Sequence, residues 1–219
     1  MAQELRTRFH QQLAEIDQGV VRLFALVAES VAGATDSLLA SDAAVAKRLA
    51  RREILVDELE LELEEVVEHQ LLTQSPMSGD MRFLVTVLRI VPQLERCADL
   101  ANHVAQRGEF GVAGRLTPEL RSLLGDMGDR CVTMWQEVAR AWSERDESAA
   151  AALDTLDDEI DRMHDELTAA LLDVDVARAD LMQATLVGRF YERLGDHAVH
   201  IAERIAYLVS GRSRSHAAD

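Results

Sequence analysis

The chain has 219 residues, and 48% of them are apolar, so it is long enough and apolar enough to bury a core. Aromatic residues make up only 4%, and three prolines and eleven glycines leave long stretches without a helix breaker, as in helical bundles. The formal net charge of −16 argues against a protein that binds nucleic acid through a basic surface, and suits one that attracts cations or basic partners.

Apolar residues at helical spacing predict three long helices in the first half of the chain. The first two are expected over about 5–40 and 43–72. Ser75 is expected to cap the third helix, with Pro76 at its first position, and this helix extends to about residue 107. Pro92 lies inside the third helix and predicts a bend there.

The second half repeats this organisation. Three glycines in residues 108–114 predict a linker, and Thr117 followed by proline predicts the start of the fourth helix. Asp146 is expected to cap the fifth helix, residues 173–175 form the next turn, and the sixth helix ends near Gly211.

Six helices in two sets of three predict an all-α fold of two tandem antiparallel three-helix bundles. We expect a first repeat at 1–108, a linker at 109–116, a second repeat at 117–211 and a disordered tail at 212–219. Cys97 and Cys131 form no disulfide framework and are expected in the core. No signal peptide is recognised and no segment approaches the length of a membrane span, so we expect a cytoplasmic protein.

A five-residue motif, Glu-Arg-x-x-Asp, occurs once in each half, at residues 95–99 and 192–196. Its two acids stand four positions apart, and so face one side of a helix, where like charges repel by roughly 0.2–0.5 kcal/mol. A second acidic pair precedes each motif, 42 residues before it in the first half (53 to 95) and 35 in the second (157 to 192). The difference of seven is about two helical turns, which indicates an internal duplication that keeps both pairs facing inward.

If each pair faces its partner across a helix hairpin, four carboxylates converge in each repeat, and they cannot all stay ionised without a cation or large pKa increases. Carboxylate oxygen and imidazole nitrogen suit Fe, Mn, Mg or Zn, and no organic cofactor is expected. The alternative is a solvated acidic stripe that pairs with Arg96 and Arg193. The predicted metal ligands are Glu53, Asp57, Glu95, Asp99, Asp157, Asp161, Glu192 and Asp196, with His103 and His200 as additional candidates.

Residues 192–203 resemble the E-R-I-G-D-H-A-x-N-I-A-E pattern of the PhoU phosphate-signalling family, and residues 95–99 match its expected first copy. Residues 74–82 resemble the family turn Q-x-P-x-A-x-D-L-R, and the resemblance covers about residues 5–211. The chain departs from the pattern where Ala98 replaces glycine, which allows less close helix packing in the first repeat. It departs again where His103 and His200 replace asparagine.

The resemblance implies tandem three-helix bundles, with metal clusters on the acidic motifs in some members. It also implies a negative regulator of phosphate-starvation signalling that links the ATPase of a phosphate ABC importer to a sensor histidine kinase. Such a protein often forms a homodimer and reaches the membrane only through its partners.

No catalytic constellation is recognised, and we expect no enzyme. A di-iron oxidase needs two Glu-x-x-His motifs, and the nearest approach, residues 161–164, occurs once. Two alternatives remain, a metal-binding or storage protein without a signalling role and a structural helical module.

Overall fold

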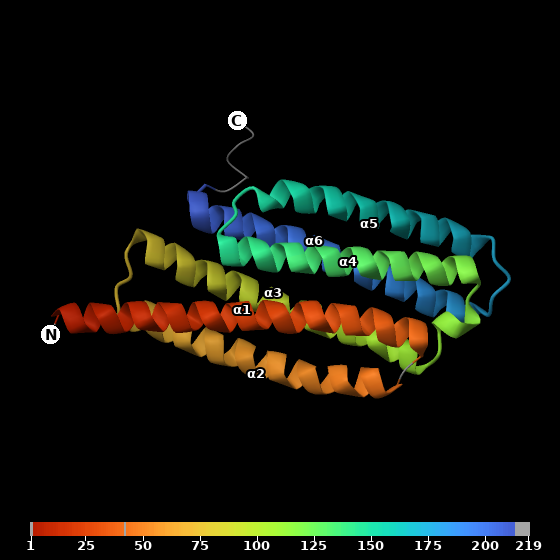
Figure 1. The fold of residues 1–219 in the computed structure, drawn as a ribbon, viewed down its shortest axis with the longest axis horizontal. Coiled ribbons are helices and arrows are strands. Elements are labelled where there is room, and N and C mark those ends of the chain that lie inside the picture. Colours follow the sequence, from red (N-terminus) through yellow and green to blue (C-terminus); the bar gives the residue numbers. More distant parts are fainter. Residues whose placement is uncertain (1, 42, 213–219) are drawn as a thin grey trace.

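The computed structural model describes residues 2–41 and 43–212, and it contains six long helices within them (Figure 1). The helices of the first half are α1 (Ala2–Ala40), α2 (Ala43–Thr73) and α3 (Ser78–Glu109). A short 3₁₀ turn, η1 (Ala113–Arg115), leads to the second half, with α4 (Pro118–Glu144), α5 (Ala149–Leu172) and α6 (Arg178–Ser210). No strand is present in the described part of the chain, so the all-α prediction is confirmed.

Helix ends follow local capping chemistry at some positions and differ from the prediction at others. The Thr117 side chain accepts from the Leu120 backbone N–H, so the predicted cap of α4 is confirmed. The third helix begins at Ser78 rather than at Pro76, because Ser75 has a φ of +45° and belongs to the turn. Asp146 accepts from the Ser148 N–H and hydroxyl but lies outside the first turn of α5, whose N-cap is Ser148.

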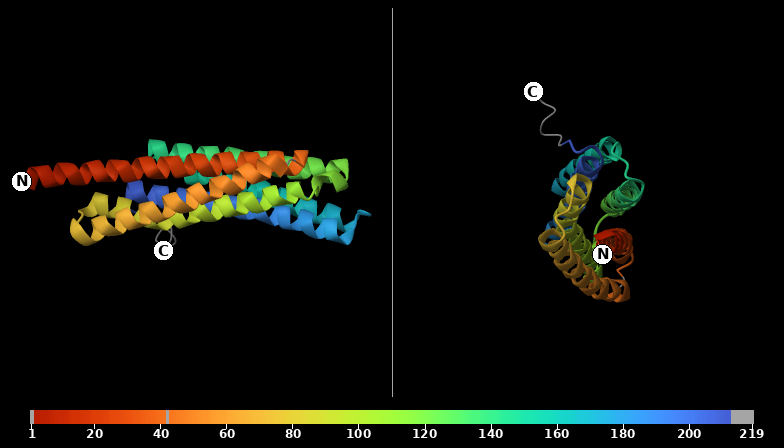
Figure 2. Two further views of the ribbon diagram at one scale, coloured as in Figure 1. Left: turned by 90° about the horizontal axis from the view of Figure 1, so that it is seen from below. Right: turned by 90° about the vertical axis from the view of Figure 1, so that its left-hand side faces the viewer.

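The helices form two elongated bundles that lie side by side. The end-on view in Figure 2 separates α1, α2 and α3 from α4, α5 and α6, and within each set every helix contacts the other two. Between the sets, α1 packs against α4 and α3 packs against α6. The predicted tandem arrangement of three-helix bundles is confirmed, with a seam made by the first and third helices of the two repeats. The exact repeat boundaries stay a prediction.

One continuous cluster of buried apolar side chains runs through both bundles. Cys97 and Cys131 are fully buried free thiols within it, as expected. Met81 and Leu186 follow the helical apolar pattern but are 39% and 38% exposed. α3 continues through Pro92 as one helix.

α1 corrects one expectation from the sequence. An 18-residue window within its residues Arg6–Ala40 has a mean hydropathy of 1.4, and the helix is long and apolar enough to cross a membrane, so the expectation that no segment approaches a span was wrong. Half of this apolar window is buried inside the protein, because α1 packs against α2, α3 and α4 and needs apolar residues on several sides. Residues 213–219 of the predicted disordered tail lie outside the described residues.

Candidate functional site

The acidic pairs of the first repeat lie on α2 and α3, two adjacent antiparallel helices. Each pair is spaced by four residues and so faces one side of its helix. Burial raises the pKa of Glu53, and the other three carboxylates raise it further, Asp99 most strongly. Burial also raises the pKa of Glu95, as do Asp57 and Asp99 across and along the hairpin. The four predicted carboxylates therefore form one electrostatically coupled group.

Two residues that the sequence analysis missed join the first group. Burial raises the pKa of Glu60, and the charge of Glu95 on the facing helix raises it further. Asn102 is 7% exposed and its side-chain amide N–H donates to Glu53 Oε2, while its carbonyl oxygen has no hydrogen-bond partner. A spacing of three residues after Asp57 and after Asp99 was the signal that would have found both residues.

The second repeat brings its four predicted carboxylates together in the same way, from α5 and α6. Burial raises the pKa of Asp157 to about 7, with further contributions from Asp161 and then Asp196. Burial also raises the pKa of Asp161, and Glu192 on the facing helix is the next largest cause. Asp157 Oδ1 is buried without a hydrogen-bond partner. An unpaired buried carboxylate oxygen of this kind is costly unless a proton or a cation meets it.

Gly195 lets Asp157 approach α6 this closely. A Cβ atom at Gly195 would lie 2.3 Å from Asp157 Oδ1, well inside contact distance. The first repeat carries Ala98 at the matching position of its motif. The motif glycine therefore makes room for a carboxylate in the second repeat, and the first repeat, with Ala98, lacks this space.

The second group also contains a guanidinium and an imidazole beside its carboxylates. Arg189 on α6 forms an ion pair with Glu192 Oε1. His164 Nδ1 on α5 lies 3.2 Å from Glu192 Oε2. His164 stands three residues after Asp161, as Glu60 stands three after Asp57, so the same spacing signal applies to both.

The two candidate histidines behave differently. His103 Nδ1 lies 3.5 Å from Asp99 Oδ1, and its ring stacks on Phe190 with centroids 5.5 Å apart. His200 Nδ1 lies 2.7 Å from the backbone carbonyl oxygen of Asp196 and is exposed, so its ring faces its own helix rather than the carboxylates. His103 is thus near its acidic group, whereas His200 needs a rotation to reach one.

The donor set fits a cation that prefers oxygen ligands. Both groups contain carboxylates that burial and mutual repulsion disfavour as anions, together with buried oxygens of Asn102, Asp157 and Glu192 that accept no hydrogen bond. Among the described residues, no three His, Cys, Asp or Glu side chains are already assembled as a metal centre. Ligation therefore requires side-chain rotation, and the predicted ligand set stays a prediction.

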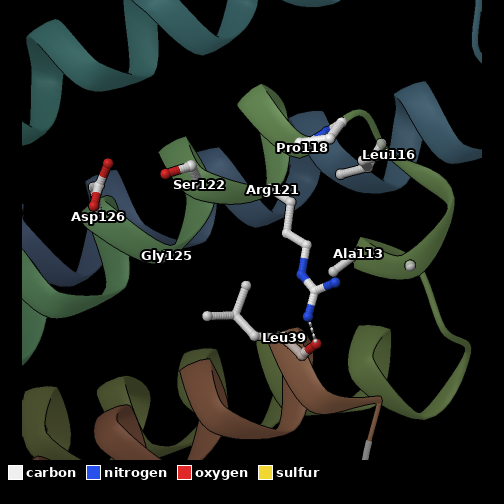
Figure 3. A pocket seen from close by; sticks show the side chains of 9 residues that line it. Leu39, Ala113, Leu116, Pro118, Arg121, Ser122, Gly125 and Asp126 are labelled. Carbon is white, nitrogen blue, oxygen red and sulfur yellow. Dashed lines mark hydrogen bonds between the residues drawn. The ribbon is translucent and has the colours of Figure 1, made fainter.

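A surface cavity of 430 Å³ lies elsewhere, between the end of α1, η1 and the start of α4. In Figure 3, Arg121 points across it, and its guanidinium donates to the Leu39 backbone oxygen at 2.7 Å. None of the eight predicted carboxylates lines this cavity. Its position separates it from the acidic groups, and we assign it no ligand.

Comparison with known proteins follows the same two halves. The PhoU domain model matches residues 20–108 and again residues 124–205. The chain belongs to the PhoU family. Each PhoU match contains one complete acidic group, 53–99 in the first and 157–196 in the second. The family resemblance read from the sequence is confirmed.

Relatives match nearly the whole chain. PhoU homolog 1 of Mycobacterium leprae, a phosphate-specific transport system accessory protein, is 29% identical over 94% of this chain and 95% of its own length. The corresponding protein of Thermotoga maritima is 26% identical, over 94% and 90%. The crystal structure of PhoU from Pseudomonas aeruginosa superposes with a TM-score of 0.87 at 25% identity, over 93% of this chain and all of that one. The Streptococcus pneumoniae regulatory protein PhoU shares the fold, with a TM-score of 0.81 at 22% identity over 93% and 98%.

Proposed function

We propose that this protein is a cytoplasmic regulatory adaptor of a phosphate transport system. It represses phosphate-starvation signalling by coupling the ATPase of a phosphate ABC importer to a sensor histidine kinase, as a homodimer that reaches the membrane only through these partners. The observation that carries the proposal is the PhoU match in both repeats, with relatives named phosphate-specific transport accessory proteins that align over 94% of the chain. The role is docking rather than catalysis.

The shape and charge of the molecule support docking. Long helices present extended exposed faces, and the net charge of −16 favours association with basic surfaces of partners. Such attraction is screened by salt, with a Debye length of about 8 Å at physiological ionic strength. Partner binding that weakens as salt rises is therefore part of the proposal.

The second element of the proposal is a metal site in each repeat. In the first repeat, Glu53, Asp57, Glu95 and Asp99 hold the ion, with Asn102 beside them. In the second, Asp157, Asp161, Glu192 and Asp196 do so. A bound Fe, Mn, Mg or Zn ion supplies positive charge to carboxylates that otherwise repel across each helix hairpin. The protein's own contribution is to hold these side chains on facing helices, α2 with α3 and α5 with α6.

Deletion of the gene in its own bacterium tests the regulatory role. We expect alkaline phosphatase to be expressed in high phosphate after deletion, and repression to return when the wild-type gene is restored. A deletion strain that still represses alkaline phosphatase in high phosphate contradicts the adaptor function. Light scattering of the purified protein at several concentrations tests the homodimer.

The acidic groups also favour a second candidate, a metal-binding or storage protein without a signalling role. Elemental analysis of natively purified protein tests the metal itself, and a protein without bound transition metal and with unchanged stability after chelation removes both metal proposals. Replacing Glu95, Asp99, Glu192 and Asp196 by alanine separates the candidates. Loss of repression supports a regulatory metal, whereas full repression by a metal-free variant leaves the adaptor role independent of the ions.

A further inference from the structure

The two acidic groups can be compared position by position because the duplication is regular. Each acid of the α6 motif stands 97 residues after its α3 counterpart, from Glu95 to Glu192 and from Asp99 to Asp196. The same offset relates Arg189 to Pro92. One repeat thus places a guanidinium three residues before its motif glutamate, where the other places a side chain that cannot carry charge.

Arg189 occupies the second group as a counter-ion. Its guanidinium pairs with Glu192 Oε1, and the charges of Asp196 and Asp161 also act on it favourably. His164 Nδ1 lies 3.2 Å from the other oxygen of Glu192, but that oxygen is buried and accepts no hydrogen bond, so Arg189 is the cationic partner of this carboxylate. The Arg189 side chain is 52% exposed, and it is therefore able to swing into solvent when another cation arrives.

Within the described residues, the first group has no counter-ion in salt-bridge contact, and the positive charge of Arg96 only partly offsets the raised pKa of Glu95. Among the described residues, no arginine or lysine forms a salt bridge with Glu53, Asp57, Glu95 or Asp99. The place of His164 is taken by Glu60, which adds a fifth carboxylate. Fully ionised, the first group carries five negative charges, whereas the second carries four that Arg189 reduces to three.

Asn102 gives the first group a ligand-like oxygen that the second lacks. The side chain is 7% exposed, its N–H donates to Glu53, and its carbonyl oxygen has no hydrogen-bond partner. Side-chain carbonyls are good ligands for hard cations. The residue at the same offset in α6 is Val199, which offers no donor atom.

We infer that the two repeats bind divalent cations unequally, the first with the higher affinity and the second only in competition with Arg189. The inference rests on the proposed metal sites and adds their order of loading. Arg189 is the resident cation of the second site, and an incoming ion must displace its guanidinium from Glu192. An exposed ion pair of this kind changes affinity by about fivefold at most on its own, and repulsion between the guanidinium and the ion adds to that factor.

Manganese binding to the purified full-length protein, measured from the EPR signal of free Mn²⁺, tests the order of loading. The double variant D161N/D196N leaves the first site, and D57N/D99N leaves the second. We expect the remaining first site to bind Mn²⁺ at least about fivefold more tightly than the remaining second site. Thermal unfolding of each variant provides a parallel readout, because an ion that binds the folded state raises Tm, and at a fixed excess of ion the rise grows with the logarithm of its affinity.

Arg189→Gln in the D57N/D99N background tests the counter-ion directly. We expect Mn²⁺ to bind the second site at least about threefold more tightly after this change. Arg193→Gln is the matched control, because it removes the same charge from an exposed position on the same helix that forms no ion pair with the four carboxylates. The reciprocal change, Pro92→Arg in the D161N/D196N background, is expected to weaken the first site.

The possible outcomes distinguish a failure of this inference from a failure of the proposed metal binding. If wild type and all variants leave Mn²⁺ free, the metal proposal fails and the inference fails with it. If both sites bind equally, or if Arg189→Gln and Arg193→Gln act alike, metal binding stands and the inference is overturned. A stronger first site together with a selective gain from Arg189→Gln supports it.

Discussion

Individual carboxylates of this protein are held in environments that favour their neutral or cation-bound forms. Asp157 illustrates the effect, since burial and four neighbouring aspartates raise its pKa to about 7. Glu53, Glu60, Glu95 and Asp161 shift in the same direction for the same causes. Ionising such a carboxylate costs more free energy in the folded protein than in the unfolded chain. A bound cation offsets this cost because it stabilises the ionised form.

The raised pKa of Asp157 predicts a pH dependence of stability in the metal-free protein. Because the folded state holds this proton more tightly than the unfolded chain, the group adds stability below about pH 4 that is lost as the pH rises through about 7. We expect Asp157→Asn to raise the free energy of unfolding by about 1 kcal/mol near pH 7.5, after discounting the shift for solvent screening at this half-buried site. Urea unfolding from pH 4 to pH 8 measures it.

The gain from Asp157→Asn should vanish near pH 4, where the wild-type carboxyl is itself neutral. Glu166→Gln, an exposed change on the same helix, is the control and should leave the pH profile unaltered. A constant stability difference at all pH values would contradict the assignment.

Gly195→Ala probes the same carboxylate from the facing helix. The added methyl group meets Asp157 Oδ1 at 2.3 Å and is expected to turn the carboxylate toward solvent, which lowers its pKa toward the ordinary value. Carbon-13 NMR titration of the aspartate carboxyls follows this directly. Gly79→Ala, where a Cβ meets nothing within 4 Å, is the control, and a retained pKa near 7 in Gly195→Ala would show that the contact does not hold Asp157 in place.

At the scale of elements, close helix packing depends on glycines placed at the contacts. α3 approaches α1 at Gly108, where a Cβ atom would lie 2.1 Å from the backbone oxygen of Ser37. Backbone atoms cannot move aside as the end of a side chain can. The hydroxyl of Ser37 also donates to the Ala105 carbonyl at 3.3 Å, so the two helices are joined by polar as well as apolar contact here.

Gly108→Ala is therefore expected to destabilise the protein by about 2–3 kcal/mol, despite the better helix propensity of alanine, because it forces α1 and α3 apart. Chemical denaturation followed by circular dichroism measures the loss. A neutral or stabilising effect would mean that the end of α3 is free to move away from α1.

At the scale of the whole molecule, the two repeats share one apolar core, and polar contacts also join them across the seam. Asp17 on α1 accepts from Trp142 Nε1 at 3.0 Å and from Arg145 at 2.7 Å at the end of α4. The Arg145 guanidinium lies 4.3 Å from the ring centroid of Trp142. Elsewhere on the seam the hydroxyls of Thr35 and Tyr191 are 3.0 Å apart in the buried core. The two repeats are similar in sequence, but they pack against each other around one common core.

This shared core predicts that the protein unfolds as one cooperative unit. We expect a single calorimetric transition whose van't Hoff enthalpy equals the calorimetric enthalpy, because separating the repeats exposes apolar surface on α1, α3, α4 and α6. A fragment limited to residues 1–116 is expected to be less stable than the whole chain. Two separate transitions in the intact protein would contradict this and describe the repeats as independent domains.

The sequence by itself determined the helices, their pairing into two repeats and the four acidic pairs, because helical periodicity and an i,i+4 spacing are local properties of the chain. It also placed His103 and His200 together as candidates, although only His103 lies near its carboxylates. Local patterns carry no information on how a side chain turns when two orientations are both compatible with a helix.

Only the tertiary structure decided which side chains meet across the hairpins. It brought Asn102 to Glu53, placed Glu60 and His164 beside the motif glutamates, and set Gly195 against Asp157. It also showed that Arg189 pairs within the second group, which makes two sites of similar sequence unequal. These contacts depend on the rotation and separation of α2 against α3 and of α5 against α6, which the apolar core of each bundle sets. A local spacing can nominate a residue for such a group, but it does not encode the contact that the residue makes.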